Sequence, residues 1–571
     1  MNELNIKIGG AAGQGLQSAG FLLGKSFVRA GHFVFAIQDA MSRIRGGHNF
    51  FQLRVSDQPI AAMTARPDIV IALDRESVEE HEPELVSGGI LLFDAEASRR
   101  TGEATHRFYV PFKELAAESG GRAVHANSVA LGAVFGLLDF DLNIARKLIR
   151  ELFAGQDAVQ TNIKALDAGY NYARDKRPNG FSRRIAVIEA TRRMFLTGSE
   201  AIALGAIAAN CRFMSAYPMS PSTSIITYLA NQEAQADIVT EQAEDEIAAV
   251  NMAFGASLAG VRSMTATSGG GLALMVETLS LLGASEVPLV IVDCQRPGPA
   301  TGLPTRTEQS DLFFVIHAGH GEFARVVLAP GNAEQAFYDM VRAFNLADRF
   351  QVPVVVLSDQ YLCDSYFTVD PFDLSKVAYE TSLLATDQLE RAESYLRYQD
   401  TDTGVSPRAY PNQSDHIVMT DSHEHDESGF MADDAATRVK MHQKRLRKIE
   451  RIRATNPGPE SFSQGECKRT IVGWGSTREI LFETAHRLSL EGDNTAVVHF
   501  DEIWPFPQQA AKLLLKDKTN TVVVENNATG QLAKLIAAYT GYNETKRILR
   551  YDGRPFMVDE LVEQIKGNLR P

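Results

Sequence analysis

Between residues 212 and 311, short apolar runs alternate with polar or glycine-rich turns. The runs are RFMSA (212–216), DIVT (237–240), VRSMTAT (261–267) and VPLVIVDC (287–294). Helical patterns separate them, which is typical of βαβ units and a parallel sheet. Ligands of such a sheet bind outside the carboxyl ends of its strands. All four polar turns lie at those ends, so the pattern predicts that their side chains converge on one cleft.

The chain before residue 180 predicts a separate α/β domain. A strand at 4–9 runs into the glycine-rich turn Gly9–Gly15 and then a helix at 17–30. Three more strands and two helices are expected, at 49–55, 68–74, 88–95, 128–138 and 142–153. The segment 175–183 is charged and contains proline and glycine, which is typical of a linker.

Two further domains are expected after residue 195. The first, 195–375, holds the four apolar runs and a strand at 352–360. A polar connecting segment, 376–464, contains a basic helical pattern at 438–453 that favours a bridging or interface helix. The last domain, 465–571, has strands at 470–476, 495–501 and 521–527 and a helix at 532–539. The fold class is therefore α/β, with three domains and mostly parallel sheets.

Composition narrows the class of protein. The chain has 571 residues, an apolar fraction of 44% and a formal net charge of −14. Without a long basic block, nucleic acid and anionic membranes are not expected partners. No run approaches the ~20 apolar residues of a membrane span, so we expect a soluble, cytoplasmic protein. The four cysteines are far apart and include no CxxC pair, which favours reduced thiols over a cluster site.

The turn Gly9–Gly15 has two interpretations. Backbone N–H groups at a helix start suit a phosphate. The dinucleotide fingerprint is only approximate, because Ala12 stands at the second glycine position, although Gly15 fills the third and Asp39 could bind a ribose. A structural tight turn is the alternative. The cationic turn Arg43–His48 could likewise hold a phosphate or be a solvated hairpin tip.

Candidate acid–base chemistry follows the second apolar run. Glu241, Glu244, Asp245 and Glu246 are predicted to crowd the first turn of a helix. Acids there can simply complement the helix dipole. Glu246, however, directly precedes an apolar face, 247–250, and a carboxyl group in an apolar cleft can exchange a proton near neutral pH.

Other candidates lie in the remaining turns. Ser268–Gly271 could bind an anion at a helix start or allow close packing. Arg296, in a Pro/Gly-rich loop, fits carboxylate recognition or is a solvated charge. Ser220 lies between two prolines and is held by a stiff backbone, or serves as a local cap. The patch 421–427, with His423 and His425, matches no firm ligand spacing, so no metal site is assigned.

Together these stretches resemble the 2-oxoacid:ferredoxin oxidoreductase family, in the form with fused γ and α parts. The motifs Gly9–Gly15 and Arg45–Gly47 resemble those of the γ domain, which would span residues 1–180. The resemblance makes 195–375 a thiamine-enzyme pyrimidine-type domain and 465–571 a transketolase-C-terminal-like domain. Their motifs are Tyr217–Ser222, Glu244–Ala249, Thr265–Gly269, Gln295–Asp311, Val524–Gln531 and Tyr551–Phe556.

The resemblance implies oxidative decarboxylation of a 2-oxoacid on thiamine diphosphate. The acyl group passes to coenzyme A, and electrons pass through [4Fe–4S] clusters to ferredoxin. Glu246 matches the catalytic glutamate that hydrogen-bonds the cofactor's aminopyrimidine. Expected residues near cofactors are Pro218, Ser268, Gly13 and Gly15; those expected near substrate are Tyr217, Ser220, Arg296 and Thr301. Ser220 stands where the family usually has threonine, and its hydroxyl is kept.

Two features absent from the sequence imply a partner. The chain has no GDG motif to hold the Mg²⁺-diphosphate and no cysteine cluster. In the family both belong to the β subunit, so we expect half an active site, completed in an (αβ)₂ assembly. The loop Thr301–Thr305 is more similar to 2-oxoglutarate enzymes than to pyruvate enzymes, and Thr301, Thr305 and Arg306 are candidates for a distal carboxylate.

Alternatives remain open at this stage. Within the family, pyruvate or a branched-chain 2-oxoacid could be the substrate. Outside it, the chain could be an NAD-dependent dehydrogenase that uses the N-terminal glycine turn, or a non-catalytic scaffold. Neither of these last two explains the motifs between Tyr217 and Asp311.

Overall fold

The structure is a computed structural model that describes residues 3–41, 47–94, 106–153, 155–178, 180–189, 191–463, 465–516, 518, 520–543 and 545–567. The chain forms two compact units. Unit 1 comprises Met1–Thr197, Asp364–Phe372 and Met557–Glu563. Unit 2 comprises Gly198–Cys363, Asp373–Phe556 and Gln564–Pro571. Each unit is therefore built from segments that are distant in sequence.

Unit 1 is a mixed sheet with helices packed on it. The strand order is β6-β5-β4-β1-β3-β2-β14-β7; β1, β4, β5 and β6 pair parallel, whereas β3, β2, β14 and β7 pair antiparallel. Its strands are β1 (Glu3–Ala11), β2 (Phe33–Ala40), β3 (His48–Ser56), β4 (Ile69–Ala72), β5 (Ile90–Phe93), β6 (Arg107–Tyr109), β7 (Met194–Thr197) and β14 (Tyr366–Val369). Its helices are α1 (Leu16–Arg29), α2 (Arg75–His81), η1 (Glu82–Glu84), α3 (Phe112–Glu118), η2 (Ala123–His125), α4 (Ala126–Leu137), α5 (Leu142–Leu152) and α6 (Gln156–Asp175).

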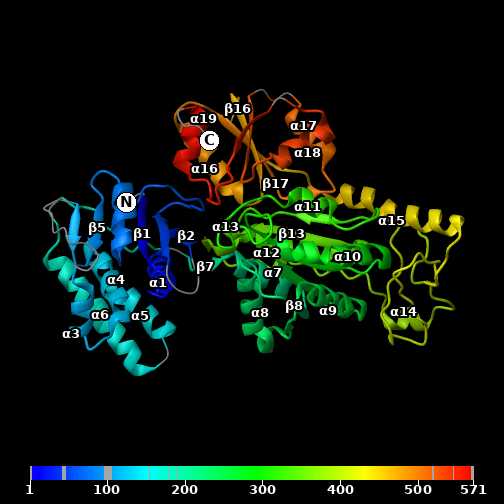
Figure 1. The fold of residues 1–571 in the computed structure, drawn as a ribbon, viewed down its shortest axis with the longest axis horizontal. Coiled ribbons are helices and arrows are strands. Elements are labelled where there is room, and N and C mark those ends of the chain that lie inside the picture. The colour runs from blue at the N-terminus through cyan, green and yellow to red at the C-terminus, as the bar shows by residue number, and fades with distance from the viewer. Residues whose placement is uncertain are drawn as a thin grey trace. The chain divides into compact units, whose positions relative to one another are not determined.

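Close helix packing holds this unit together. Helix α1 packs on β2 and β3 and joins α4, α5 and α6 in one helical layer (Figure 1). Helices α4 and α6 approach through glycines: a Cβ on Gly132 would lie 2.0 Å from the Leu166 carbonyl oxygen, and one on Gly169 would lie 2.0 Å from that of Val129. Only glycine permits backbones to approach so closely.

Unit 2 contains the predicted parallel sheet. Its order is β18-β12-β13-β11-β10-β8-β9, and every pairing except β12–β18 is parallel. Its strands are β8 (Phe213–Ala216), β9 (Val239–Gln242), β10 (Ser263–Thr267), β11 (Leu289–Gln295), β12 (Val326–Leu328), β13 (Pro353–Asp359) and β18 (Glu502–Trp504). Its helices are α7 (Gly198–Ala208), α8 (Thr223–Ala236), α9 (Glu246–Leu258), α10 (Gly269–Ser285), α11 (Leu312–His317), α12 (Ala333–Phe350) and α13 (Gln360–Asp364).

A smaller sheet of unit 2 shares a hydrophobic core with this one. Its order is β15-β17-β16-β19-β20. Buried Trp474 and Phe500 of this sheet belong to the same core cluster as Leu312 and Val315 of α11. The elements are β15 (Glu460–Phe462), β16 (Arg469–Trp474), η4 (Gly475–Thr477), α16 (Arg478–Leu490), β17 (Thr495–Phe500), α17 (Gln508–Leu515), β19 (Thr521–Glu525), α18 (Gln531–Thr540), β20 (Thr545–Leu549) and α19 (Val558–Lys566), whose first residues belong to unit 1.

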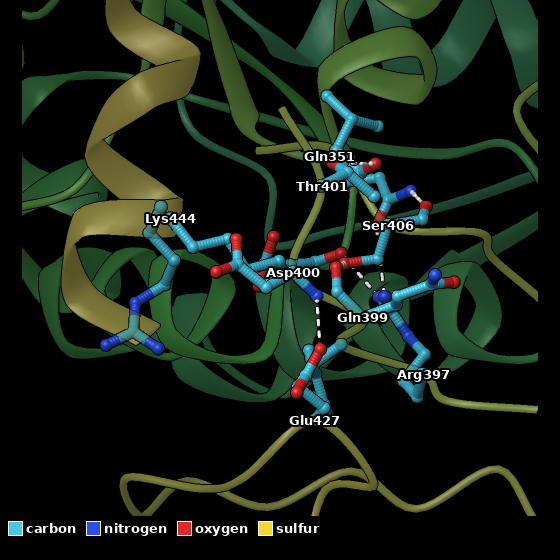
Figure 2. Close-up of polar contacts among 12 residues, drawn as sticks. Gln351, Arg397, Gln399, Asp400, Thr401, Ser406, Glu427 and Lys444 are labelled. Carbon is cyan, nitrogen blue, oxygen red and sulfur yellow. Dashed lines mark hydrogen bonds and ion pairs between the residues drawn. The ribbon is translucent and has the colours of Figure 1, made fainter. Parts of the chain in front are cut away.

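The polar segment 373–464, which we call the arm, contains little regular structure before a long basic helix. Its helices are η3 (Leu374–Lys376), α14 (Thr386–Glu390) and α15 (Ala435–Thr455). Figure 2 shows how the arm is held: Arg397 donates to the Gln351 side chain at 3.0 Å, Gln351 donates to the Ser406 carbonyl at 2.6 Å, and the Asp400 N–H donates to Glu427 at 2.7 Å.

A buried ion cluster fixes α15. Lys444 Nζ lies 2.6 Å from Glu286 Oε1, Lys448 pairs with the other oxygen, and all three side chains are at most 2% exposed. Arg397 donates to the Glu286 carbonyl at 2.7 Å. Although burial opposes it, the charges of Lys448 and Lys444 hold the pKa of Glu286 well below its usual range. The basic helix therefore bridges the arm to α10.

None of the helices within the described part of the chain is long and apolar enough to cross a membrane.

Candidate functional site

The start of α9 places Glu246 in the interior. Strand β9 ends at Gln242, and Asp245 caps the helix by accepting from the Ala248 N–H at 2.7 Å. Glu246 is the first helical residue and only 4% exposed. The prediction that four acids crowd the first turn is wrong, because Glu241 lies in β9 and Glu244 precedes the cap. The cap at Asp245 sets the helix start and turns Glu246 inward.

Glu246 lies against the start of α10. A Cβ on Gly271 would lie 2.7 Å from Glu246 Cγ and 2.0 Å from Thr267 Oγ1, so only glycine fits there. Oε1 of Glu246 is buried and makes no hydrogen bond. A buried carboxyl oxygen without a partner is costly. A polar group of a ligand beside this oxygen would satisfy it.

Further unpaired oxygens gather at the same strand ends. Ser268 caps α10 without a side-chain hydrogen bond, and its buried Oγ has no partner. Oδ2 of Asp311 lies 2.4 Å from the position of a Cβ on Gly269, also without a partner. Asp293, which pairs in register with Thr267, is fully buried, and neither carboxyl oxygen is hydrogen-bonded.

The two aspartates were missed by the sequence analysis. Burial and the nearby Asp311 raise the pKa of Asp293 well above its usual range, and burial raises the pKa of Asp311 to about 6. An acid inside the apolar run VIVDC was the signal that could have found Asp293. Asp311 follows a loop after β11, so no regular spacing in the sequence relates it to Asp293.

We expect Asp311→Asn to stabilise the protein at neutral pH. A carboxyl with a folded pKa near 6 and an unfolded pKa near 4 destabilises the fold above pH ~6, and that penalty is lost as pH falls toward ~4. Removing the charge should add up to about 3 kcal/mol at pH 7 and nothing near pH 4. Thermal unfolding at pH 5 and pH 7 measures this.

The control for this prediction is Glu244→Gln, which neutralises an exposed acid. It should leave the pH dependence of the unfolding temperature unchanged. The same pH dependence in wild type and Asp311→Asn would refute the assignment.

The expected substrate residues lie on neighbouring loops of the same sheet edge. Arg296, at the end of β11, donates from Nη1 to the Ser220 carbonyl oxygen at 2.8 Å. The contact therefore uses the backbone of Ser220, not its hydroxyl. Tyr217, at the end of β8, is 40% exposed, Pro218 beside it is partly buried, and Thr301 is exposed.

The strand order places the four predicted turns at one edge of the sheet. Strands β11, β10, β8 and β9 are adjacent and parallel. Their carboxyl ends carry Arg296, Ser268, Ser220 and the turn to Glu246, respectively.

The glycine turn of unit 1 is a second, separate feature. Gly13 and Gly15 have φ of 89° and 77°, and Gly15 caps α1. The Asn127 side chain donates to the Gln14 carbonyl, and a Cβ on Gly15 would lie 2.6 Å from Asn127 Nδ2. Asp39 lies in β2. Arg43, Arg45 and Gly46 lie outside the described residues.

The side chains of the patch 421–427, which we considered for a metal site, contact other protein groups. His423 contacts Asp421 at 2.6 Å, Glu424 accepts from Arg445, and His425 lies against the Tyr398 ring. Among the described residues, no group of three or more His, Cys, Asp or Glu side chains is arranged to hold a metal ion. Two acids of this patch, Glu424 and Glu427, pair with basic residues of α15.

Comparisons with known proteins agree with the resemblance. Residues 204–444 match the family model of the pyruvate flavodoxin/ferredoxin oxidoreductase thiamine diphosphate-binding domain, and 5–172 match that of pyruvate ferredoxin/flavodoxin oxidoreductase. The α subunit of a Sulfolobus 2-oxoacid:ferredoxin oxidoreductase is 31% identical over 99% of this chain and 96% of its own. A 2-oxoglutarate synthase subunit KorA from Methanothermobacter marburgensis is 29% identical over 66% of this chain and 99% of its own.

A solved structure matches over the full length. The 2-oxoglutarate:ferredoxin oxidoreductase from Magnetococcus marinus, with 2-oxoglutarate, coenzyme A and succinyl-CoA bound, is 30% identical, covers 100% of both chains and has a TM-score of 0.92. The predicted α/β fold class is confirmed. The chain belongs to the family of 2-oxoacid:ferredoxin oxidoreductase α subunits.

Proposed function

We propose that this chain provides half of the active site of a 2-oxoglutarate:ferredoxin oxidoreductase (2-oxoglutarate synthase). The enzyme oxidatively decarboxylates 2-oxoglutarate to succinyl-coenzyme A, or runs the reverse reaction. The observation that carries the proposal is the buried, unpaired carboxyl oxygen of Glu246 at the carboxyl edge of the sheet. The full-length likeness to the Magnetococcus marinus enzyme supports the substrate.

The residues at this edge fit thiamine diphosphate. Among the described residues Oε1 of Glu246 has no partner, and it would hydrogen-bond the aminopyrimidine. When bound, the cofactor would supply the carbon nucleophile for the keto group. Glu246 would hold a proton at a pyrimidine nitrogen. Ser268 and Pro218, on adjacent loops, would line the cofactor.

The substrate carboxylate would bind at Arg296. One guanidinium nitrogen is held by the Ser220 carbonyl, which orients the remaining N–H groups. A fixed guanidinium suits a carboxylate. Ser220 and Tyr217 would lie beside the keto group, and Thr301 with Arg306 would lie near the distal carboxylate.

A β subunit would complete the site. The relatives are named alpha subunits, which implies such a partner. We assign Mg²⁺, the [4Fe–4S] clusters and the ferredoxin contact to it, within an (αβ)₂ assembly. The glycine turn with Gly13 and Gly15 would lie on the coenzyme A side.

The function is tested by an assay of the chain purified with its β partner, thiamine diphosphate, Mg²⁺, coenzyme A and a viologen dye. Coenzyme A-dependent dye reduction with 2-oxoglutarate, and not with pyruvate or 2-oxoisovalerate, is expected. Reduction with another acid alone would move the substrate assignment to that acid. No reduction with any acid, in a complex that holds its cofactors, would refute the proposal.

Arg296→Ala should raise the KM for 2-oxoglutarate by roughly 10- to 100-fold, the loss of one charge-assisted contact. Thiamine diphosphate binding should stay unchanged, since Arg296 is assigned to substrate. Arg306→Ala is the comparison, with a smaller expected rise. An unaltered KM in Arg296→Ala would remove its role.

A further inference from the structure

A cavity lies within unit 1, between the end of α1 and the segment before β7. Its volume is about 470 Å³, within the range of small-molecule sites. Its walls are Lys25, Val28, Arg29, Gly31, Ile188, Thr191, Arg192, Arg193, Met194 and Phe195. None of these residues belongs to the glycine turn or to the site on unit 2.

Four of the lining side chains are cations, from two segments of the chain. Glu151 pairs with Arg29 and is close enough to Lys25 and Arg192 for their charges to help lower its pKa. A second acid, Asp370, lies 3.5 Å from Arg193 and is 76% exposed, and Glu189 lies in the same segment as Ile188 and is exposed. One cation in the last turn would complement the dipole of α1. The four cations exceed that need and outnumber these three acids.

Backbone and side-chain contacts fix the wall of the cavity. Gly31 has a φ of 95°, and a Cβ there would lie 2.3 Å from the Ile188 carbonyl oxygen, so the segment before β7 packs directly on the turn after α1. The Ile188 N–H donates to the Ala30 carbonyl at 2.9 Å. Arg193 donates to the Gly31 carbonyl at 3.1 Å and lies 3.9 Å over the Phe33 ring.

Apolar side chains form the rest of the wall. Val28 and Phe195 are buried, at 7% and 6% exposure, and Met194 is partly buried. Phe195 packs against Gly24, where a Cβ would lie 2.7 Å from its ring, and it stacks on Phe21. A ligand here would meet both cations and apolar side chains.

We propose that this cavity binds a nucleoside phosphate, with its phosphates among Lys25, Arg29, Arg192 and Arg193 and its base against Val28, Met194 and Phe195. Guanidinium and ammonium groups recognise phosphate, and aromatic or aliphatic side chains receive the base. The ligand is a free nucleotide. The site is independent of the proposed reaction, because its residues are not assigned to substrate or thiamine diphosphate.

Calorimetric titration of the complete complex with ADP, coenzyme A and inorganic pyrophosphate tests this. ADP should bind more tightly than pyrophosphate, because the base adds contacts. In the double variant K25Q/R192Q, affinity should fall by roughly 30-fold or more, from two lost charge-assisted contacts. Arg29 and Arg193 are left in place because they pair with Glu151 and donate to the Gly31 carbonyl, respectively. Lys25 Nζ lies 5.0 Å over the Phe21 ring.

The matched control is R75Q/K164Q, which removes two exposed charges of unit 1 outside the cavity. It should bind as wild type does. Loss of coenzyme A binding in K25Q/R192Q, with no ADP binding in either protein, would show that the cavity belongs to the coenzyme A site and would overturn the proposal. Unchanged ADP and coenzyme A affinities in a folded K25Q/R192Q, or pyrophosphate binding as tightly as ADP, would overturn the proposal. Because binding is measured without turnover, an inactive enzyme would not affect the result.

Discussion

Glu246→Gln is expected to lower 2-oxoglutarate-dependent dye reduction by roughly 10²- to 10⁴-fold, the usual contribution of acid–base catalysis. The amide keeps the shape of the side chain, and Gly271 leaves room for no other bulk. It removes the ionisable oxygen that we propose to hold the cofactor's pyrimidine proton. The rate is measured in the assembled complex at saturating substrate and cofactor.

Folding gives an independent readout for this variant. Oε1 of Glu246 has no partner in the protein, so glutamine should leave the unfolding temperature without cofactor unchanged or slightly higher. Glu244→Gln, two residues earlier and exposed, should keep full activity. Near-normal turnover in Glu246→Gln would defeat the catalytic assignment.

Glu286→Gln is expected to cost about 3–5 kcal/mol of stability, as does breaking a buried ion pair from one side. Lys444 and Lys448 would remain buried without their counter-charge. Burial already lowers the pKa of Lys448 to about 8. Arg397 would keep its bonds to main-chain oxygens, so the loss falls on the two lysines. Thermal and urea unfolding measure the cost.

The arm should also open in this variant. Limited proteolysis is expected to cut between residues 373 and 434 faster than in wild type, because α15 loses its buried anchor. Glu427→Gln breaks a pair that is partly exposed, with Lys440, and should cost below ~1 kcal/mol. Equal effects of the two substitutions would show that the buried cluster does not hold the arm.

Much of unit 2 could be predicted because its strands are buried on both faces. Runs such as VPLVIVDC are continuous and apolar, and each ends in a polar turn, so β8, β10, β11 and β13 were found close to their true bounds. The positions of Glu246, Ser268 and Arg296 could be predicted in the same way, because each residue lies in or directly after a polar turn that follows a strand. The helix start was misplaced, since one carboxylate cap at Asp245 decides it and neighbouring acids look alike.

Partners far apart in sequence could not be predicted. Glu286 directly follows the last residue of α10, where an acid opposes the helix dipole, and its two lysines come about 160 residues later. Asp293 and Asp311 meet only because a loop returns to the sheet. Strands β2, β7 and β14 were not predicted. The domain limits at residues 180, 195, 375 and 465 remain predictions.

The pairing of β14 with β2 and β7 has a consequence for how such a chain can be divided. The sheet of unit 1 is completed by residues beyond 363, so its fold is discontinuous along the gene. A cut near residue 180 would remove β14, one of the two neighbours of β2, and leave Phe33–Ala40 as an edge strand, open to pairing with other chains. A γ-type subunit encoded on its own therefore needs another cover for that edge, whereas here fusion provides it.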